Sequence, residues 1–366
     1  MKRATSAGRW SKVLKVAPLL AGVCLAQSPT FSLQVLSTSS GEQGGFVYGI
    51  NNVGQAVGVA GGSVCPSGCA VVWRDGAATV LGAVNGVFGY ESLGINNLSQ
   101  VVGTAEMSDS PHTFQAIIWN NGTPTVLPSP GSQYVSAFAV SINDAGLVVG
   151  SAEEAGGTNI VPVAWNGSIP TVLGFAPGYT SANANGVNGS GLVVGTMCCA
   201  KAQEPEAVVW HGTTPTLLAT AQSSPYPAGK ALAANNLGLV VGTATNSVGG
   251  THAAAWANGA VTDLGTLATG YFSSATAVND RGVIVGESAT LDNGEIHAAL
   301  WGRVGAAPQD LNKLISAVRA AEFLLSGATG INNNCSIVVN GYNRKTGVAE
   351  AFLLTLIDSS NCVNGL

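Results

Sequence analysis

Histidine and carboxylate side chains are the groups of this sequence that could carry acid–base or metal chemistry, and they are sparse. The four histidines are His112, His211, His252 and His297. None of them stands in a helical metal pair or beside a matching carboxylate in the sequence. No Gly-x-Ser-x-Gly elbow and no phosphate-cradling loop occurs either. His252 and His297 occupy equivalent strand positions, so we interpret them as polar residues at strand ends rather than as catalytic groups.

Carboxylates would matter in pairs, because hydrolysis of a glycosidic bond needs two of them facing each other across the bond. Asp144 and Asp280 take a turn position where other copies of a repeat have Asn, and turn chemistry explains both. Four glutamates after apolar strands would form an acidic patch if one face carried them all, namely Glu106, Glu153, Glu154 and Glu287. The interpretation as solvated loops is favoured over a catalytic cluster, so we predict no catalytic residue.

Metal sites receive no more support than catalytic ones. Leu291–Glu295 and Met107–Ser110 lie in the same loop of different repeats, and the first resembles a calcium loop without the regular spacing of oxygen ligands. Zinc normally takes two separated cysteine pairs or added histidines, and Cys65-Pro-Ser-Gly-Cys69 has no partner pair. We therefore predict no metal ion and no cofactor.

The cysteines fit disulfides better. Six remain beyond the N-terminal segment, and an even number in an oxidising compartment indicates disulfide bonds. Cys65 and Cys69 share one loop, and position favours a bond between Cys335 and Cys362. A bond between the neighbours Cys198 and Cys199 would strain the backbone, so we expect those two to be free. The disulfide candidates are thus Cys65, Cys69, Cys335 and Cys362.

A recurring asparagine is the most suggestive polar feature. It occurs once in each of seven similar stretches, at Asn51, Asn96, Asn143, Asn188, Asn235, Asn279 and Asn332. A ring of amides could bind a ligand on an axis, but an Asn in a tight turn more often bonds its own backbone. We favour the structural interpretation and expect ligand binding, whose residues the sequence leaves unknown, in the loops that differ between copies.

The elements that position these residues follow one repeating unit. The asparagines are 44 to 53 residues apart, and a second marker runs in phase with them at Trp73, Trp119, Trp165, Trp210, Trp256 and Trp301. The pattern of each unit predicts four short strands. The first is small and weakly polar, and an Asn-containing turn leads to the second, which is apolar and ends in Gly. The third strand ends in Trp, and the fourth follows a turn that contains Gly. A short helix is expected only within 310–330, where helix formers cluster.

A four-stranded repeat of this length is typical of a β-propeller blade, because a ring of blades buries both faces of each sheet. The seventh copy ends after its third strand, whereas Phe31–Leu36 precedes the first copy and matches the fourth strands. The sequence therefore predicts an all-β, seven-bladed propeller closed by Phe31–Leu36. One domain would extend over 27–366, and we expect it to be a monomer. The conserved tryptophan position is interpreted as packing between blades.

The repeats resemble the HAF-repeat family of extracellular bacterial proteins, named for a His-Ala-Phe triplet. The likeness covers nearly the whole of the expected mature chain, in "GINNVGQAVG" at 49–58, "HAALW" at 297–301 and "DLNKLI" at 310–315. The triplet itself is poorly kept, since its His position holds Cys69, Gln115, Val161, Glu206, His252, His297 and Glu350. The resemblance implies an exported repeat protein, and the varied position argues against a repeated catalytic or metal site.

Composition and the N-terminus agree with export. Only 9% of the 366 residues are charged and the net charge is −5, without the basic stripe that nucleic acid binding requires. Residues 1–26 combine a basic start, the apolar run "VAPLLAGVCLA" and a small Ala26, which is the order of a signal peptide. The run is shorter than the ~20 residues that span a bilayer. We expect no transmembrane segment in the mature chain and a location at the cell surface, outside the cell or in the periplasm.

Two functions of different classes follow. The favoured one is a non-enzymatic binding or scaffold module for a glycan or a protein, since turns, an export signal and sparse charge come without a catalytic constellation. The alternative is an extracellular polysaccharide hydrolase or lyase with carboxylates at the propeller mouth. Propellers host both, so the arrangement of carboxylates in space must decide. An amide-lined mouth would favour binding, and a facing carboxylate pair would favour hydrolysis.

Overall fold

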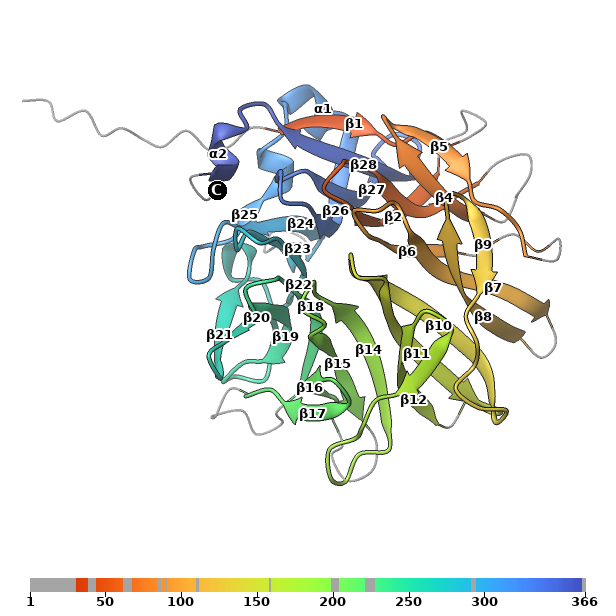
Figure 1. Ribbon diagram of the computed structural model, residues 1–366. Coiled ribbons are helices and arrows are strands. Elements are labelled where there is room, and N and C mark those ends of the chain that lie inside the picture. Colours follow the sequence, from red (N-terminus) through yellow and green to blue (C-terminus); the bar gives the residue numbers. More distant parts are fainter. Residues whose placement is uncertain are drawn as a thin grey trace, which may run out of the picture.

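The computed structural model describes residues 31–38, 44–61, 68–84, 87, 89, 91–109, 112–157, 159–198, 204–220, 228–290 and 294–363. The predicted signal peptide, Cys65 and Cys199 therefore lie outside the described residues. Within them the chain forms seven four-stranded antiparallel sheets, arranged as the blades of a ring (Figure 1). The prediction of a seven-bladed β-propeller is confirmed.

The first four blades follow the chain, and in each the strand order runs from the axis outward. Blade 1 contains β2 (Gly45–Ile50), β3 (Ala56–Ala60), β4 (Cys69–Arg74) and β5 (Ala77–Val80). Blade 2 contains β6 (Glu91–Ile95), β7 (Val101–Asp109), β8 (His112–Asn120) and β9 (Thr123–Val126). Blade 3 contains β10 (Tyr134–Ile142), β11 (Leu147–Glu154), β12 (Ile160–Asn166) and β13 (Ile169–Val172). Blade 4 contains β14 (Ser181–Val187), β15 (Val193–Cys198), β16 (Glu206–His211) and β17 (Thr214–Leu217).

The last three blades include the closure. Blade 5 contains β18 (Gly229–Ala234), β19 (Val240–Thr245), β20 (Thr251–Ala257) and β21 (Ala260–Gly265), followed by the 3-10 turn η1 (Leu267–Thr269). Blade 6 contains β22 (Ser273–Val278), β23 (Ile284–Ala289), β24 (Ile296–Trp301) and β25 (Gln309–Asp310). Blade 7 contains β26 (Phe323–Ile331), β27 (Ile337–Asn343), β28 (Ala349–Leu356) and, from the other end of the chain, β1 (Phe31–Val35).

The ring closes by pairing its two chain ends. β1 runs antiparallel to β28 with Phe31 opposite Leu356 and Val35 opposite Phe352, and Leu36 N donates to Ala351 O at 2.8 Å. Figure 1 shows the red strand β1 beside the blue strand β28. Phe31 is only 2% exposed and packs in a cluster with residues of blades 6 and 7. The predicted closure by Phe31–Leu36 is confirmed.

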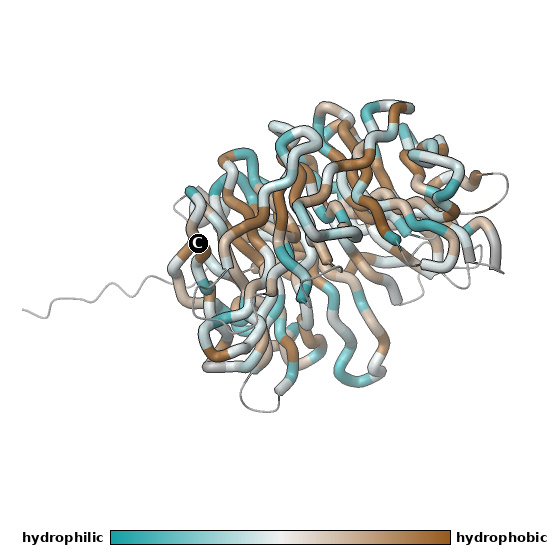
Figure 2. Tube along the Cα trace, turned by 90° about the horizontal axis from the view of Figure 1, so that it is seen from below, coloured by the Kyte–Doolittle hydropathy of each residue, from teal (hydrophilic) through white to brown (hydrophobic). Residues whose placement is uncertain are grey.

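The blades pack through apolar side chains, with a tryptophan at six of the seven junctions and Leu354 at the equivalent position between blades 6 and 7. One cluster joins Val57 and Ala70 of blade 1 to Val101 and Trp119 of blade 2, and the five other junctions with a tryptophan repeat this pattern. Trp119 Nε1 donates to Gly82 O at 2.9 Å, so the indole also ties its strand to the segment leaving the preceding blade. In Figure 2 the hydrophobic colour follows the strands, and the hydrophilic colour gathers at many of the connections. The packing role predicted for the tryptophan position is confirmed.

The glycine that ends the motif "VVG" has a steric cause. A Cβ at Gly150 would lie 1.9 Å from Phe138 O, and one at Gly286 would lie 1.9 Å from Ser274 O. The inner strand bulges beside this position, with register shifts between Ala139 and Ser141 and between Ala275 and Ala277. The bulge bends the inner strand close to its neighbour, so only glycine fits.

The connection between blades 6 and 7 holds the predicted short helix. The 3-10 turn η2 (Leu311–Lys313) and α1 (Ala317–Glu322) lie there, and α2 (Ser360–Val363) ends the described chain. Cys362 of α2 forms a disulfide with Cys335, which closes a loop of 27 residues between the last Asn turn and the tail. Cys69 and Cys198 are disulfide-bonded as well. The expectation of free cysteines at 198–199 is therefore wrong for Cys198.

Candidate functional site

The propeller has two different faces, because successive antiparallel strands reverse direction. The turns between first and second strands, which carry the repeated Asn, lie at one end of the ring, and we call this the turn face. The loops between second and third strands lie at the opposite end, the loop face. Parts of those loops, at 62–67, 110–111, 199–203 and 291–293, lie outside the described residues. The turn face is described in full around the axis.

The repeated Asn closes a ring of hydrogen bonds around the axis. Each Nδ2 donates to the backbone carbonyl of the same residue in the next blade, at 2.8–3.0 Å, and the seventh bond, from Asn332 to Asn51 O, completes the circle. Each of these side chains is buried. Asn143 Oδ1 also accepts from Ala145 N at 3.1 Å and Leu147 N at 3.0 Å within its own turn. The structural interpretation of this Asn is confirmed, and the bonds between blades add a role that the sequence did not suggest.

The next residue of each turn forms a second layer that faces the opening. Its members, which we call the rim, are Asn52, Asn97, Asp144, Gly189, Asn236, Asp280 and Asn333. The backbone N–H of a rim residue donates to the side-chain Oδ1 of the next one, as in Asn52 N to Asn97 Oδ1 at 2.8 Å and Asn236 N to Asp280 Oδ1 at 2.8 Å. Six such bonds join the seven blades.

The rim surrounds a polar cavity on the axis. This axial mouth has a volume of about 220 Å³ and is lined by the repeated Asn, the rim and the residue before each Asn. The residues before the Asn form an aliphatic collar at its base, consisting of Ile50, Ile95, Ile142, Val187, Ala234, Val278 and Ile331. Beyond the collar a wider axial channel of about 620 Å³ is lined by the inner strands.

Two carboxylates belong to the mouth and both are engaged with neighbouring turns. Asp144 in blade 3 accepts from Asn97 N and from Asn97 Nδ2, each at 2.8 Å. Asp280 in blade 6 accepts from Asn236 N and Asn236 Nδ2, at 2.8 and 3.0 Å, and from Asn333 Nδ2 at 2.8 Å. They stand three blades apart and bond to turns on their own sides. Both residues lie in turns as expected, but nothing in the sequence indicated that their side chains bond to the turns of neighbouring blades.

The glutamates considered from the sequence are not gathered at the mouth. Glu106, Glu153 and Glu154 lie in the second strands of blades 2 and 3, and Glu287 lies in that of blade 6. Burial raises the pKa of Glu287, and it also raises the pKa of Glu91 at the start of an inner strand. Among the described residues no group of three or more His, Cys, Asp or Glu side chains could hold a metal ion.

Two histidine–aspartate pairs were missed by the sequence reasoning. His252 Nδ1 lies 3.0 Å from both carboxylate oxygens of Asp263, and His297 Nδ1 lies 3.0 Å from Asp310 Oδ2. The hydrogen bond to Asp310 raises the pKa of His297 against the opposing effect of burial. The sequence did contain a sign of these pairs. Two repeats have His in the third strand, in "HAAAW" and "HAALW", and only these two have Asp followed by Leu at the end of the fourth strand.

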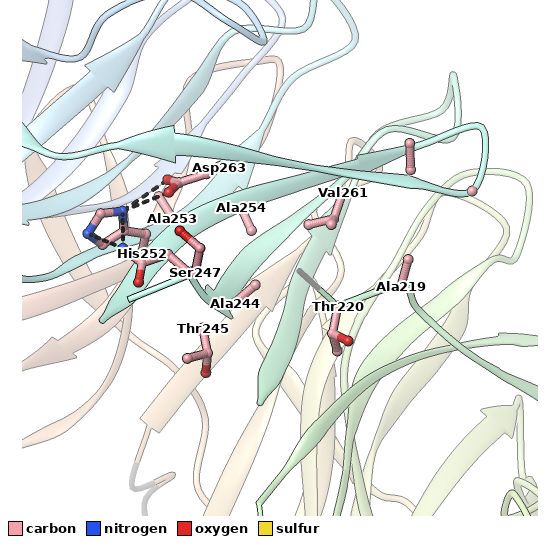
Figure 3. Close-up of a pocket in the computed structure, with 13 residues that line it drawn as sticks. Ala219, Thr220, Ala244, Thr245, Ser247, His252, Ala253, Ala254, Val261 and Asp263 are labelled. Atoms are coloured by element: carbon pink, nitrogen blue, oxygen red, sulfur yellow. Dashed lines mark hydrogen bonds and ion pairs between the residues drawn. The ribbon is translucent and has the colours of Figure 1, made fainter. Parts of the chain in front are cut away.

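The histidine–aspartate pair in blade 5 borders a separate cavity of about 500 Å³, which lies at the outer part of the blade and away from the axis (Figure 3). His252 and Asp263 lie at one end of it, and Thr220 and Ala219 lie at the other. Between them the walls are mostly small, as at Ala244. The equivalent His297 in blade 6 has its other ring nitrogen 3.3 Å from Glu295 Oε2. The pair in blade 5 thus borders a cavity, whereas both ring nitrogens of His297 lie close to carboxylates.

The same third-strand position is polar in blades 4 and 7 too. In blade 4, Tyr179 Oη donates to Glu206 at 2.6 Å, and burial together with this bond raises the pKa of Tyr179 to about 12. In blade 7, Glu350 is 2% exposed, and its Oε1 has no hydrogen-bond partner among the described residues. Burial, with a smaller effect of the nearby Glu322, raises the pKa of Glu350. The position thus serves a histidine–aspartate pair in blades 5 and 6, a tyrosine–glutamate bond in blade 4 and a buried carboxyl group in blade 7.

No helix in the described part of the chain has the length and apolar character needed to cross a bilayer.

The strands that close the ring, β1 and β28, are the two outer strands of blade 7 and lie away from the axial mouth.

Comparison with known proteins gives a likeness of arrangement only. No protein-family model and no curated protein sequence matches the chain. Among solved structures it is similar to TolB from Acinetobacter baumannii, with a TM-score of 0.40 and 11% identity over 74% of this chain and 65% of that one. It is similar to the gluconolactonase XC5397 from Xanthomonas campestris, with a TM-score of 0.39 and 14% identity over 72% of this chain and 85% of that one. It is also similar to Trypanosoma rangeli sialidase, with a TM-score of 0.41 and 8% identity over 78% of this chain and 58% of that one. The chain thus spans less than two thirds of the TolB and sialidase chains.

Proposed function

We propose that this protein is an exported, non-enzymatic binding module with HAF-type repeats, and that it holds a neutral glycan in the axial mouth. The observation that carries the proposal is the lining of that mouth, which combines four side-chain amides, two carboxylates and one glycine above an aliphatic collar. Binding sites commonly pair an apolar floor with a few convergent polar groups in this way.

The chemistry of the rim suits hydroxyl groups. A rim amide such as Asn97 uses one N–H and one oxygen lone pair within the rim and keeps a second of each. A sugar hydroxyl both donates and accepts, so the two complement each other. The collar residues, such as Ile95 and Ile142, give the carbon-bound hydrogens of a sugar ring an apolar surface. Asp144 and Asp280 make the mouth anionic, which disfavours phosphate, sulfate and uronate ligands.

The hydrolase alternative receives less support from the mouth. Asp144 and Asp280 are its only carboxylates, and both accept hydrogen bonds from neighbouring turns. They act as parts of the rim, and a glycosidase requires one carboxyl group free to give a proton to the leaving oxygen. The disulfide between Cys335 and Cys362 supports export, because such bonds persist in oxidising compartments.

The proposal is tested by applying the full chain to an array of neutral and anionic glycans, followed by calorimetric titration of the best neutral ligand. Asn97→Ala removes a rim amide that also holds Asp144, so we expect binding to weaken about tenfold, which equals about 1.4 kcal/mol. Asn183→Ala is the matched control, since Asn183 lies on β14 toward the other end of the axis, outside the mouth.

Three results would count against this function. They are an array without signal above background, binding that Asn97→Ala leaves unchanged, and preference for anionic glycans. Release of new reducing ends from the bound glycan, abolished by Asp144→Asn, would favour the hydrolase instead.

A further inference from the structure

The ring of rim bonds has one break, in blade 4. Asp144 N–H has no rim side chain to donate to, because the next rim residue is Gly189. Gly189 N itself donates to Asn236 Oδ1 at 2.6 Å, so the ring resumes at once on the other side. The rim therefore lacks a side chain at a single point, between Asp144 and Asn236.

A groove leads away from this point. It has a volume of about 440 Å³ and runs between the turns of blades 4 and 5 on the turn face. Asn188 and Asn236 line both the groove and the axial mouth, so the two cavities adjoin on either side of Gly189. A groove volume between about 300 and 1,000 Å³ is typical of a ligand site.

The groove combines a flat floor with polar and apolar walls. Gly191, Gly212 and Gly238 contribute no side chains to it. His211 is exposed, and Leu237 is 79% exposed although it is a large aliphatic residue. A ring and an aliphatic side chain beside backbone polar groups offer a sugar both a packing surface and hydrogen bonds.

We propose that the mouth and this groove form one continuous site for a linear neutral oligosaccharide. One end of the oligosaccharide lies in the mouth, and its following sugar units leave over Gly189 and lie along His211 and Leu237. This inference rests on the proposed function of the mouth and adds the length and direction of the ligand.

The other directions out of the mouth are closed by rim side chains. Asn97 accepts from Asn52 N and donates to Asp144, and Asn333 accepts from Asp280 N and donates to Asp280 Oδ2. A ligand that left the mouth there would have to break these bonds. At Gly189 no side chain rises from the rim, and the backbone N–H of Gly189 with the side chain of Asn236 borders the mouth on the way to the groove.

The test compares cellohexaose, maltohexaose and chitohexaose with their monosaccharides in calorimetric titrations of the full chain. We expect at least one hexasaccharide to bind about tenfold or more tightly than its monosaccharide. Gly189→Asn supplies the missing acceptor for Asp144 N–H and fills the exit. The new Cβ would meet only the end of the Asn236 side chain, at 2.7 Å from Oδ1, which can shift. We expect this variant to bind the hexasaccharide no better than the monosaccharide.

Two further variants keep the test decisive. Gly61→Asn is the matched control, because nothing lies within 4 Å of a Cβ there and Gly61 is outside the mouth and groove. Leu237→Ala opens no cavity in the core and should weaken the hexasaccharide alone, by about threefold or more, which gives an independent measurement if Gly189→Asn fails to fold.

The outcomes separate this inference from the proposed function. If the unaltered chain binds none of the sugars, both are overturned. If it binds monosaccharide and hexasaccharide equally well, or if Leu237→Ala and Gly189→Asn weaken both to the same degree, the groove is excluded and the mouth remains as the site.

Discussion

Single residues show how one repeat position takes on different local roles. The third-strand position before Ala carries His252 and His297 beside aspartates, Glu206 beside a tyrosine and the buried Glu350 without a partner at Oε1. A group kept for one chemistry would be expected to keep its identity. Here the residue follows its own blade, so the position is structural in most copies.

The histidine–aspartate pairs mark the limit of sequence reasoning at this scale. Asp263 and Asp310 lie 11 and 13 residues after their histidines. The strand pairing that brings them together depends on the register of the outer hairpin, which the letters alone do not specify. Comparing the two repeats side by side would have linked the residues, because His and Asp change together.

Glu350 provides a prediction about pH. Its pKa is raised in the folded protein, so the folded state holds the proton more tightly than the unfolded chain does. Stability that depends on this proton is complete below the unfolded value near 4.5 and is lost as the pH rises through the raised value. Glu350→Gln should therefore gain stability over the unaltered chain as the pH rises from 4 to 7, by about 1.4 kcal/mol for each unit of the pKa increase.

The measurement is the free energy of unfolding by denaturant at several pH values. Glu204→Gln, at an exposed site, is the matched control and should show no such trend. An advantage of Glu350→Gln that stays constant from pH 4 to 7 would contradict the account of a buried proton.

Single elements could be located from the sequence where their pattern repeats. The four strands per unit, the Asn turns and the short helix within 310–330 all occur where they were predicted. The fourth strand of blade 7 was the hardest case, because it comes from the far end of the chain. Phe31–Leu36 could be assigned only because the seventh copy lacked a strand and the first was preceded by one.

The closing strand should be as important as any central one. Phe31 is 2% exposed and its backbone N–H donates to Leu314 O at 2.8 Å, so Phe31→Ala would open a cavity between blades 6 and 7. We expect it to lower the free energy of unfolding by about 3–5 kcal/mol. Phe46→Ala removes a ring that is 46% exposed on the inner strand β2 and should cost about 0.5 kcal/mol. Equal effects in denaturant titrations would show that the ends do not close the ring.

The whole molecule is a sevenfold ring whose departures from symmetry carry the proposal. The regular features, the buried Asn ring and the tryptophan bonds, hold the blades together and are used up in doing so. The one copy with Gly in place of Asn or Asp at the rim, "GVNGSGLVVG", was visible in the sequence. Its consequence was not visible there, because the rim bonds join residues of neighbouring blades that lie far apart in the sequence, as for Asn52 and Asn97 at a separation of 45.

The loop face was expected to carry the binding residues, and that expectation remains a prediction, since several of its loops lie partly outside the described residues. The mouth offers a better-defined site because every rim position is described and its hydrogen bonds can be traced. Rim and groove together fit an extended ligand with many hydroxyl groups.

The most direct measurement is a crystal structure of the full chain with a bound neutral hexasaccharide. The account predicts sugar density in the axial mouth, in hydrogen-bond contact with Asn97 and Asp144, and continuing over Gly189 toward Leu237. Density confined to the loop face or to the cavity beside His252, with an empty mouth, would contradict it.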